Sequence, residues 1–190
     1  ADMTRYELFL RETRTYEIIE DVKNFRSEIG VLFLNSYNRD VLTKMFDDNR
    51  LTYTSLFKAR PHIFVSKSNP LAKHEVVSLE DLEEFPYLSY DQGIHNSFYY
   101  SEEILSQIPH KKSIVVSDRA TLFNLLIGLD GYTIATGILN SNLNGDNIVS
   151  IPLDIDDEID IVYLKHEKAT LSKMGEKFLD NLVKEVTFDN

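Results

Sequence analysis

The chain has 190 residues, with 31 acidic against 20 basic side chains, a net charge of −11 and no cysteine. The absence of cysteine excludes disulfides and thiolate metal sites, and the acidic balance opposes direct binding to nucleic acid, which needs clustered cations. A hydrophobic fraction of 43% can build a substantial core, and no apolar run approaches the roughly 20 residues that cross a bilayer.

The first third of the chain predicts a strand, a helix and a second strand. Residues 6–10 (YELFL) alternate weakly as a strand does, and apolar side chains recur at helical spacing from Thr13 onward. The apolar run at 28–35 (EIGVLFLN) is typical of a buried strand. This order predicts a βαβ unit and therefore a parallel sheet. A helix over 39–49 and a short strand near 51–57 follow.

The middle and end of the chain continue this alternation of strands and helices. A strand after residue 60 ends in a turn at Asn69-Pro70, and a short helix starts at a capping box formed by Ser78 and Asp81. The remaining expected elements are strands at 87–90, 111–116, 132–135, 146–153 and 157–166, and helices at 97–108, 118–128 and 171–186.

Three segments in register resemble the effector-binding part of LysR-type transcriptional regulators. Residues 68–88 (SNPLAKHEVVSLEDLEEFPYL) are similar to the family's "PLA…vsLeDL…yP" pattern. Residues 12–32 (ETRTYEIIEDVKNFRSEIGVL) resemble its strand, Ser/Thr-rich turn, helix and "DlgI" strand, and 116–137 (VSDRATLFNLLIGLDGYTIATG) resemble its "GlGi" segment. The three occur in the family's order and together span nearly the whole chain.

The resemblance implies an α/β fold of two lobes, like that of a periplasmic solute-binding protein. Each lobe would be a mainly parallel sheet flanked by helices, and two crossover strands would join them. Lobe I would comprise residues 1–59 and 156–190, and lobe II residues 60–155. The crossovers would fall near 59–61 and 155–159.

The sequence departs from the family pattern in three places. No winged helix-turn-helix is present, so we expect DNA binding to belong to an absent N-terminal domain. The family's first strand and helix, which precede the position of Leu8, are also missing. Lobe I is then truncated, or its gap is filled by another chain or by a rearranged strand. Finally, Thr136-Gly137 replaces the family's usual Leu-Pro pair.

Three predicted strand-to-helix junctions carry small polar side chains. Ligands of open α/β sheets bind beyond the carboxyl ends of the strands, where helix N-termini offer unpaired N–H groups to anions. The resemblance places all three junctions around one interlobe cleft. The candidate effector-binding residues are Thr13, Arg14, Thr15, Gln92, Gly93, Asn96, Ser97, Ser117, Asp118, Thr121 and Thr136.

A purely structural interpretation of the same residues stays open. Thr13, Ser97 and either Ser117 or Asp118 are suited to cap helices, and a cap is compatible with ligand contact. Arg14 has acidic neighbours with which it could form a surface ion pair. A positive charge at a helix N-terminus nevertheless opposes the helix dipole, which favours an anionic partner for Arg14.

Signatures of catalysis and of metal binding are lacking. The five histidines show no metal-binding spacing, although His95 lies in the candidate cleft loop. The acidic run at 154–160 (DIDDEID) lacks the spacing and glycine of an EF-hand, so it is either a solvated turn or an unusual cation site. No nucleophile or phosphate-binding motif occurs. We therefore expect no catalytic residue, no metal and no cofactor.

The function that this pattern favours is ligand sensing within a cytoplasmic LysR-type regulator. A small anionic or zwitterionic effector would bind between the lobes and shift their orientation. A homodimer or higher homo-oligomer would pass the shift to DNA-binding domains, with no role for a membrane. The main alternative is a solute-binding protein of a transporter, which would have the same fold. An enzyme on this fold is a third possibility.

Overall fold

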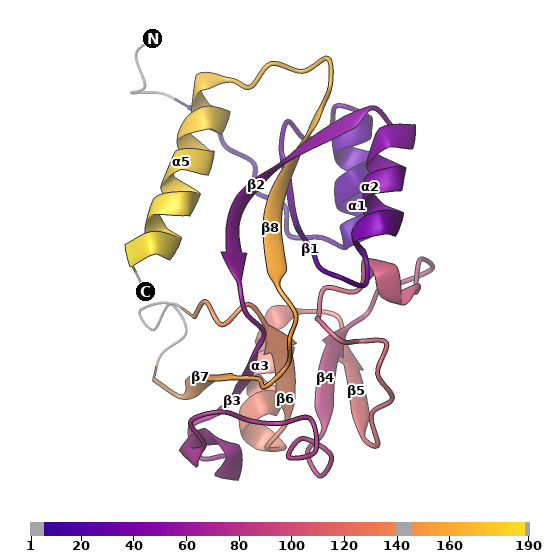
Figure 1. Cartoon of the computed structure of the whole chain (residues 1–190). Helices are drawn as coiled ribbons and strands as arrows, with labels where there is room; N and C mark the ends of the chain where they lie inside the picture. Colours follow the sequence, from indigo (N-terminus) through magenta and orange to yellow (C-terminus); the bar gives the residue numbers. More distant parts are fainter. Residues whose placement is uncertain (1–5, 140–145, 189–190) are drawn as a thin grey trace.

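The computed structural model describes residues 6–139 and 146–188, which form two lobes, each built on its own sheet (Figure 1). The strands are β1 (Gly30–Leu34), β2 (Leu51–Ala59), β3 (His62–Ser66), β4 (Tyr87–Tyr90), β5 (Ser113–Val116), β6 (Tyr132–Ala135), β7 (Ile148–Pro152) and β8 (Ile159–His166). The helices are α1 (Thr15–Lys23), α2 (Arg39–Asp48), α3 (Arg119–Gly128) and α5 (Lys173–Phe188), with short 3-10 helices η1 (Pro70–Lys73) and η2 (Phe98–Tyr100).

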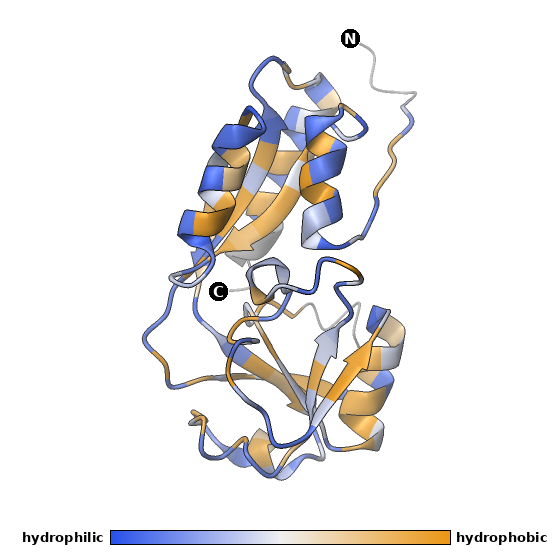
Figure 2. Cartoon of the chain, turned by 90° about the vertical axis from the view of Figure 1, so that its right-hand side faces the viewer, coloured by the Kyte–Doolittle hydropathy of each residue, from blue (hydrophilic) through white to orange (hydrophobic). Residues whose placement is uncertain are grey.

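The sheet of lobe I has the strand order β1-β8-β2. Helices α1 and α2 cover one face of this sheet, and α5 lies against the other (Figure 1). Apolar side chains from α1, α2 and all three strands form a single buried cluster, because they recur on the inward side of each element. Figure 2 shows this division, with apolar strands between helices whose outer faces are polar.

The sheet of lobe II has the order β5-β4-β6-β3-β7. The interior strand β3 is buried on both faces: Ile63 and Val65 join one apolar cluster, and Phe64 joins another that includes residues of α3. Successive side chains of a strand point to opposite faces, so a strand covered on both faces favours a continuous apolar run. The run IFV in β3 meets this requirement.

The chain passes between the lobes twice. Residues 60–61 link β2 to β3, and residues 153–158 link β7 to β8 (Figure 1). The expected two-lobed fold is therefore confirmed. No helix within the described part of the chain is both long and apolar enough to cross a membrane.

The expectation of mainly parallel sheets is wrong for lobe I. Both of its pairings are antiparallel, with Leu32 opposite Val162 and Tyr53 opposite Leu164. Strand β8 arrives from lobe II and inserts between β1 and β2, which run in the opposite direction. Lobe II is mixed, since β4 pairs in parallel with β5 and β6, whereas β3 pairs antiparallel with β6 and β7.

Residues 6–10 do not form the expected strand, so the predicted βαβ unit is wrong. They have no regular structure, and Phe9 and Leu10 are 85% and 80% exposed. A strand needs a neighbour to pair its backbone N–H and C=O groups. Residues 6–10 pair with no strand of the described sheet, although β1 pairs with β8 alone and so has one free edge.

Two predicted helices are also replaced by tighter turns. Only η2 forms within 97–108, and Leu105 adopts a left-handed φ of 61° that interrupts a helix. Residues 79–84 form turns, although the predicted capping bonds are present. The N–H of Ser78 donates to Asp81 Oδ2 (2.9 Å), and the N–H of Asp81 donates to Ser78 Oγ (3.3 Å).

The lobe I core yields a test of these burial assignments. Phe46 of α2 is fully buried, so Phe46→Ala is expected to lower the free energy of unfolding by about 3–5 kcal/mol, measured by urea denaturation. Phe9→Ala removes the same atoms from the exposed segment and is the matched control, with a change below about 0.5 kcal/mol. Equal losses for both variants would contradict the exposed position of residues 6–10.

Candidate functional site

A cavity of about 280 Å³ lies between the lobes, where the N-terminus of α1 faces the carboxyl ends of β4 and β5. Its volume is just below the range of about 300–1,000 Å³ for pockets that hold drug-sized ligands, so it suits a small metabolite. The lining residues are Glu12, Thr13, Arg14, Tyr90, Asp91, Glu102, Ser117, Asp118 and Arg119.

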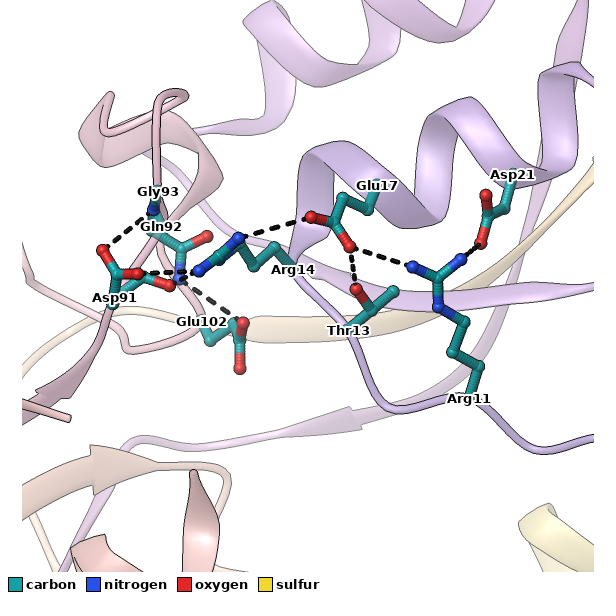
Figure 3. Close-up of polar contacts among 9 residues, drawn as sticks. All are labelled: Arg11, Thr13, Arg14, Glu17, Asp21, Asp91, Gln92, Gly93 and Glu102. Atoms are coloured by element: carbon teal, nitrogen blue, oxygen red, sulfur yellow. Dashed lines mark hydrogen bonds and ion pairs between the residues drawn. The ribbon is translucent and has the colours of Figure 1, made fainter. Parts of the chain in front are cut away.

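Arg14 connects the two lobes across this cavity (Figure 3). Its Nη2 lies 2.7 Å from Oδ2 of Asp91, and its Nε donates to the backbone carbonyl of Asp91 at 2.9 Å. A third contact, 3.4 Å long, joins Nη1 to Oε1 of Glu17 within α1. The anionic partner expected for Arg14 is thus supplied by the chain itself, from both lobes.

The turn after β4 is shaped to receive the Arg14 side chain. The N–H of Gly93 donates to Oδ1 of Asp91 at 2.9 Å, and this bond, followed by the charge of Arg14, lowers the pKa of the Asp91 carboxyl. Gly93 has a φ of +61°, and a Cβ atom there would lie 2.9 Å from Nη1 of Arg14. Glycine therefore suits both the turn and the close approach of the guanidinium group, which a side chain at position 93 would displace.

Thr13 does not cap α1. The N-cap position belongs to Arg14, whose side chain makes no capping bond, whereas Thr13 Oγ1 donates to Oε2 of Glu17. This bond is the main cause of the lowered pKa of Glu17. Arg11 also contacts Glu17 and lies 2.7 Å from the buried Asp21 (Figure 3). The start of α1 is thus held by a network of carboxylates and guanidinium groups.

At the start of α3, Asp118 has the predicted capping role. Its Oδ1 accepts from the N–H of Thr121 at 2.9 Å, and its Oδ2 accepts from the Thr121 hydroxyl at 2.8 Å. Both bonds lower the pKa of Asp118. Ser117 lies beside it on the cavity wall, so a ligand in the cavity can reach its hydroxyl.

Two adjacent carboxyl groups, Glu102 and Glu103, lie in the half-buried segment that follows η2. Burial raises the pKa of Glu102, and the negative charge of Glu12 raises it further. Glu103 is 4% exposed and accepts from the N–H of Tyr90 at 2.6 Å. Burial raises its pKa to about 8. Gln92 donates through Nε2 to Glu102 at 3.4 Å.

Aromatic rings add a second set of contacts between the lobes. Tyr16 of α1 stacks on His95 with centroids 3.5 Å apart, and its edge meets Tyr100. Tyr37 stacks on Tyr99 at 4.8 Å. His95, considered as a ligand contact, thus packs on α1, and it is absent from the cavity lining.

The predicted site residues divide into three groups. Thr13, Arg14, Ser117 and Asp118 line one cavity together. Gln92, Gly93 and Thr121 contact lining residues without lining the cavity. The other four, Thr15, Asn96, Ser97 and Thr136, do not line the cavity. Thr15 is buried as the first residue of α1, Asn96 and Ser97 are exposed, and Thr136 is half-buried.

Sequence reasoning missed five lining residues. Asp91 had a usable signal, since it directly follows the strand YLSY and precedes the predicted Gln92-Gly93 turn. Arg119 follows Ser117-Asp118 and could have been found in the same way. Tyr90, Glu12 and Glu102 had no distinguishing pattern, and Glu102 was assigned to a helix that does not form.

A second cavity, of about 420 Å³, lies at the crossover and contains none of the predicted site residues. Asp157 of the acidic run accepts from Asn35 Nδ2 (3.2 Å) and from the N–H of Ser36 (3.4 Å). The run is therefore tied to the end of β1. Within the described residues, no three His, Asp or Glu side chains are placed to hold a metal. The lining residues are Asn35, Ser36, Arg39, Arg60, Ile155, Asp156, Asp157 and Glu158.

The raised pKa of Glu103 predicts how stability depends on pH. A carboxyl group with a pKa near 4.5 when unfolded and about 8 when folded stabilises the fold fully below pH 4.5. This contribution is lost as the pH rises through 8 and is of the order of a few kcal/mol. The substitution Glu103→Gln keeps an acceptor for the Tyr90 N–H but introduces a side chain that cannot ionise.

We therefore expect urea midpoints of Glu103→Gln to change less between pH 5 and pH 9 than those of the unmodified chain. Glu80→Gln, which makes the same change on an exposed turn, is the control and should retain the original slope. Parallel pH profiles for the unmodified chain and Glu103→Gln would show that Glu103 is not desolvated.

The family model for the LysR substrate binding domain matches residues 4–187. No curated protein matches the chain. Among solved structures, HinK, a LysR family transcriptional regulator from Pseudomonas aeruginosa, has a TM-score of 0.62 and 15% identity, over 92% of this chain and 58% of that one. This chain therefore spans less than two thirds of that regulator.

Two isolated effector-binding domains have similar folds. The effector binding domain of QuiR in complex with shikimate has a TM-score of 0.62 and 18% identity, over 91% of this chain and 78% of that one. The BenM effector binding domain with its effector benzoate has a TM-score of 0.60 and 18% identity, over 93% of this chain and 76% of that one. Identities this low establish a shared fold alone. With the family model covering nearly its whole length, the chain belongs to the family of LysR substrate-binding domains.

Proposed function

We propose that this chain is the ligand-sensing part of a LysR-type transcription regulator and binds a small effector in the 280 Å³ cavity. The observation that carries the proposal is the position of this cavity, whose walls come from both lobes and are joined by the Arg14–Asp91 pair. A ligand there touches groups whose separation depends on how the lobes are oriented. It can therefore favour one orientation through differential affinity.

The role is regulatory rather than catalytic. We propose the lobe boundaries at 59/60 and 155/156, which agree with the positions of the two crossings. The effector contacts would come from Thr13, Arg14, Ser117 and Asp118, with Gln92, Gly93 and Thr121 supporting the lining residues. The similar effector-binding domains with shikimate or benzoate support a small-molecule effector.

In the complete regulator, a homodimer or higher homo-oligomer in the cytoplasm would pass the lobe movement to a DNA-binding domain. Such coupling requires two lobe arrangements that differ in their affinity for the effector. Only one of the two arrangements would favour DNA binding by the attached domain. The acidic charge of this chain fits a division of labour in which another domain contacts the phosphates.

Calorimetry against amino acids, sulfur metabolites and aromatic acids tests the sensing role. At least one class is expected to bind, and Thr13→Ala should weaken that binding several-fold while lowering stability by no more than about 1 kcal/mol. Thr43→Ala removes a hydroxyl from α2, outside the cavity, and is the control. A folded chain that binds none of these compounds at millimolar concentration would refute the role.

A second prediction concerns lobe orientation. Arg14→Gln removes the charged link to Asp91, and because both side chains are partly exposed we expect a stability loss below about 1 kcal/mol. Small-angle scattering should nonetheless show a larger radius of gyration. Lys44→Gln removes an exposed pair with Asp48 within α2 and should leave the radius unchanged. An unaltered radius for Arg14→Gln would mean that Arg14 does not hold the lobes together.

A further inference from the structure

The charges around the interlobe cavity are unbalanced toward the negative. Its lining contains four carboxyl groups and only two guanidinium groups. The carboxyl groups come from both lobes: Glu12 precedes α1, whereas Asp91, Glu102 and Asp118 belong to lobe II. A free anion entering this cavity would meet an excess of like charge.

The groups that would attract an anion already have partners in the chain. Arg14 contacts Asp91 and Glu17, and the guanidinium of Arg119 lies 4.8 Å from the centre of the Phe123 ring. The positive end of α3 is occupied by the carboxylate of Asp118. Glu17, in the first turn of α1, offsets the dipole of that helix. An incoming carboxylate would have to displace one of these internal partners.

Two of the carboxyl groups, Glu12 and Glu102, have neither an ion pair among the described residues nor a helix N–H of the kind that Asp118 accepts. Glu102 accepts one long bond from Gln92. After burial, the charge of Glu12 is a further cause that raises the pKa of Glu102, whereas the bond from Gln92 and the charge of Arg14 lower it. The two groups therefore oppose each other across the boundary between the lobes, and a positive charge placed between them would relieve that repulsion.

A buried acceptor in the same place gives independent support. Gln92 is 8% exposed, and its Oε1 has no hydrogen-bond partner within the described chain. Gln92 lies behind the cavity lining, where its Nε2 donates to the lining residue Glu102 (Figure 3). A buried unsatisfied oxygen costs free energy, so this position favours a ligand that brings N–H donors.

We propose that the effector carries a protonated amine or guanidine, which lies between Glu12 and Glu102 with Gln92 Oε1 as a further acceptor. An ammonium group has three donors and no acceptor, which matches a site made of acceptors alone. Because Glu12 belongs to lobe I and Glu102 to lobe II, the bound cation draws the lobes together. This inference rests on the proposed sensing function and specifies the chemistry of its ligand.

Three five-carbon compounds separate charge from size. Pentane-1,5-diamine carries two ammonium groups, 5-aminopentanoate carries one ammonium and one carboxylate, and glutarate carries two carboxylates. Calorimetry on the full chain, with each compound at up to about 10 mM and constant ionic strength, should detect binding of at least one ammonium compound. Glutarate should bind at least tenfold more weakly.

Variants then locate the cation. Glu102→Gln and Glu12→Gln should each weaken binding of the ammonium compound at least tenfold. Glu80→Gln, with the same change in charge on an exposed turn outside the cavity, should leave binding unchanged. Thermal unfolding of each variant verifies that it is folded. Equal effects of Glu80→Gln and Glu102→Gln would reduce the result to net charge and overturn the inference.

Failure of the inference differs from failure of the sensing role. If glutarate, benzoate or another anion binds and the ammonium compounds do not, the inference is overturned while the sensing role stands. Tighter anion binding by Glu102→Gln than by the unmodified chain would support the inference, because the substitution removes one of the carboxylates that repel an anion. If no compound of any charge binds the folded chain, the sensing role fails together with the inference.

Discussion

Strand β8 is the element on which the cleft depends. It pairs with β1 on one side and β2 on the other, so lobe I has no sheet until the chain has returned from lobe II. Helix α1 packs on β1 and β8, and the position of Arg14 at its N-terminus follows from that packing. The pairing of Leu32 with Val162 illustrates the distance along the chain over which this contact forms. One long-range strand thus places the lobe I wall of the cavity.

The contacts between the lobes are numerous but individually weak. The Arg14–Asp91 pair is partly exposed, and such pairs contribute about 0–1 kcal/mol each. The stacking of Tyr16 on His95 and of Tyr37 on Tyr99 adds contributions of similar size. A boundary held in this way suits a sensor, because a ligand worth a few kcal/mol of differential affinity can shift the equilibrium between two lobe orientations.

Much of the fold was predictable because local periodicity and packing agree. Strands with a buried face, such as residues 62–66, and the helices over 15–23, 39–48 and 173–188 lie close to their expected positions. The failures share a cause. Residues 6–10 have strand-like alternation but pair with no strand, and residues 97–108 have helical spacing interrupted at Leu105. In both segments tertiary contacts, or their absence, outweigh propensity.

By itself the sequence determined the α/β class and the likeness to one family, and through that likeness it implied two lobes. It also placed Thr13 and Arg14 just before a helix, and Ser117 and Asp118 between a strand and a helix, because these are local patterns. Only the tertiary structure decided which charges meet. Arg14 and Asp91 are 77 residues apart, and no periodicity links Glu12 to Glu102. The strength of an electrostatic interaction depends on the distance between the charges in space. The sequence could therefore indicate a polar cleft, but the net charge of the cavity lining could be known only from the folded chain.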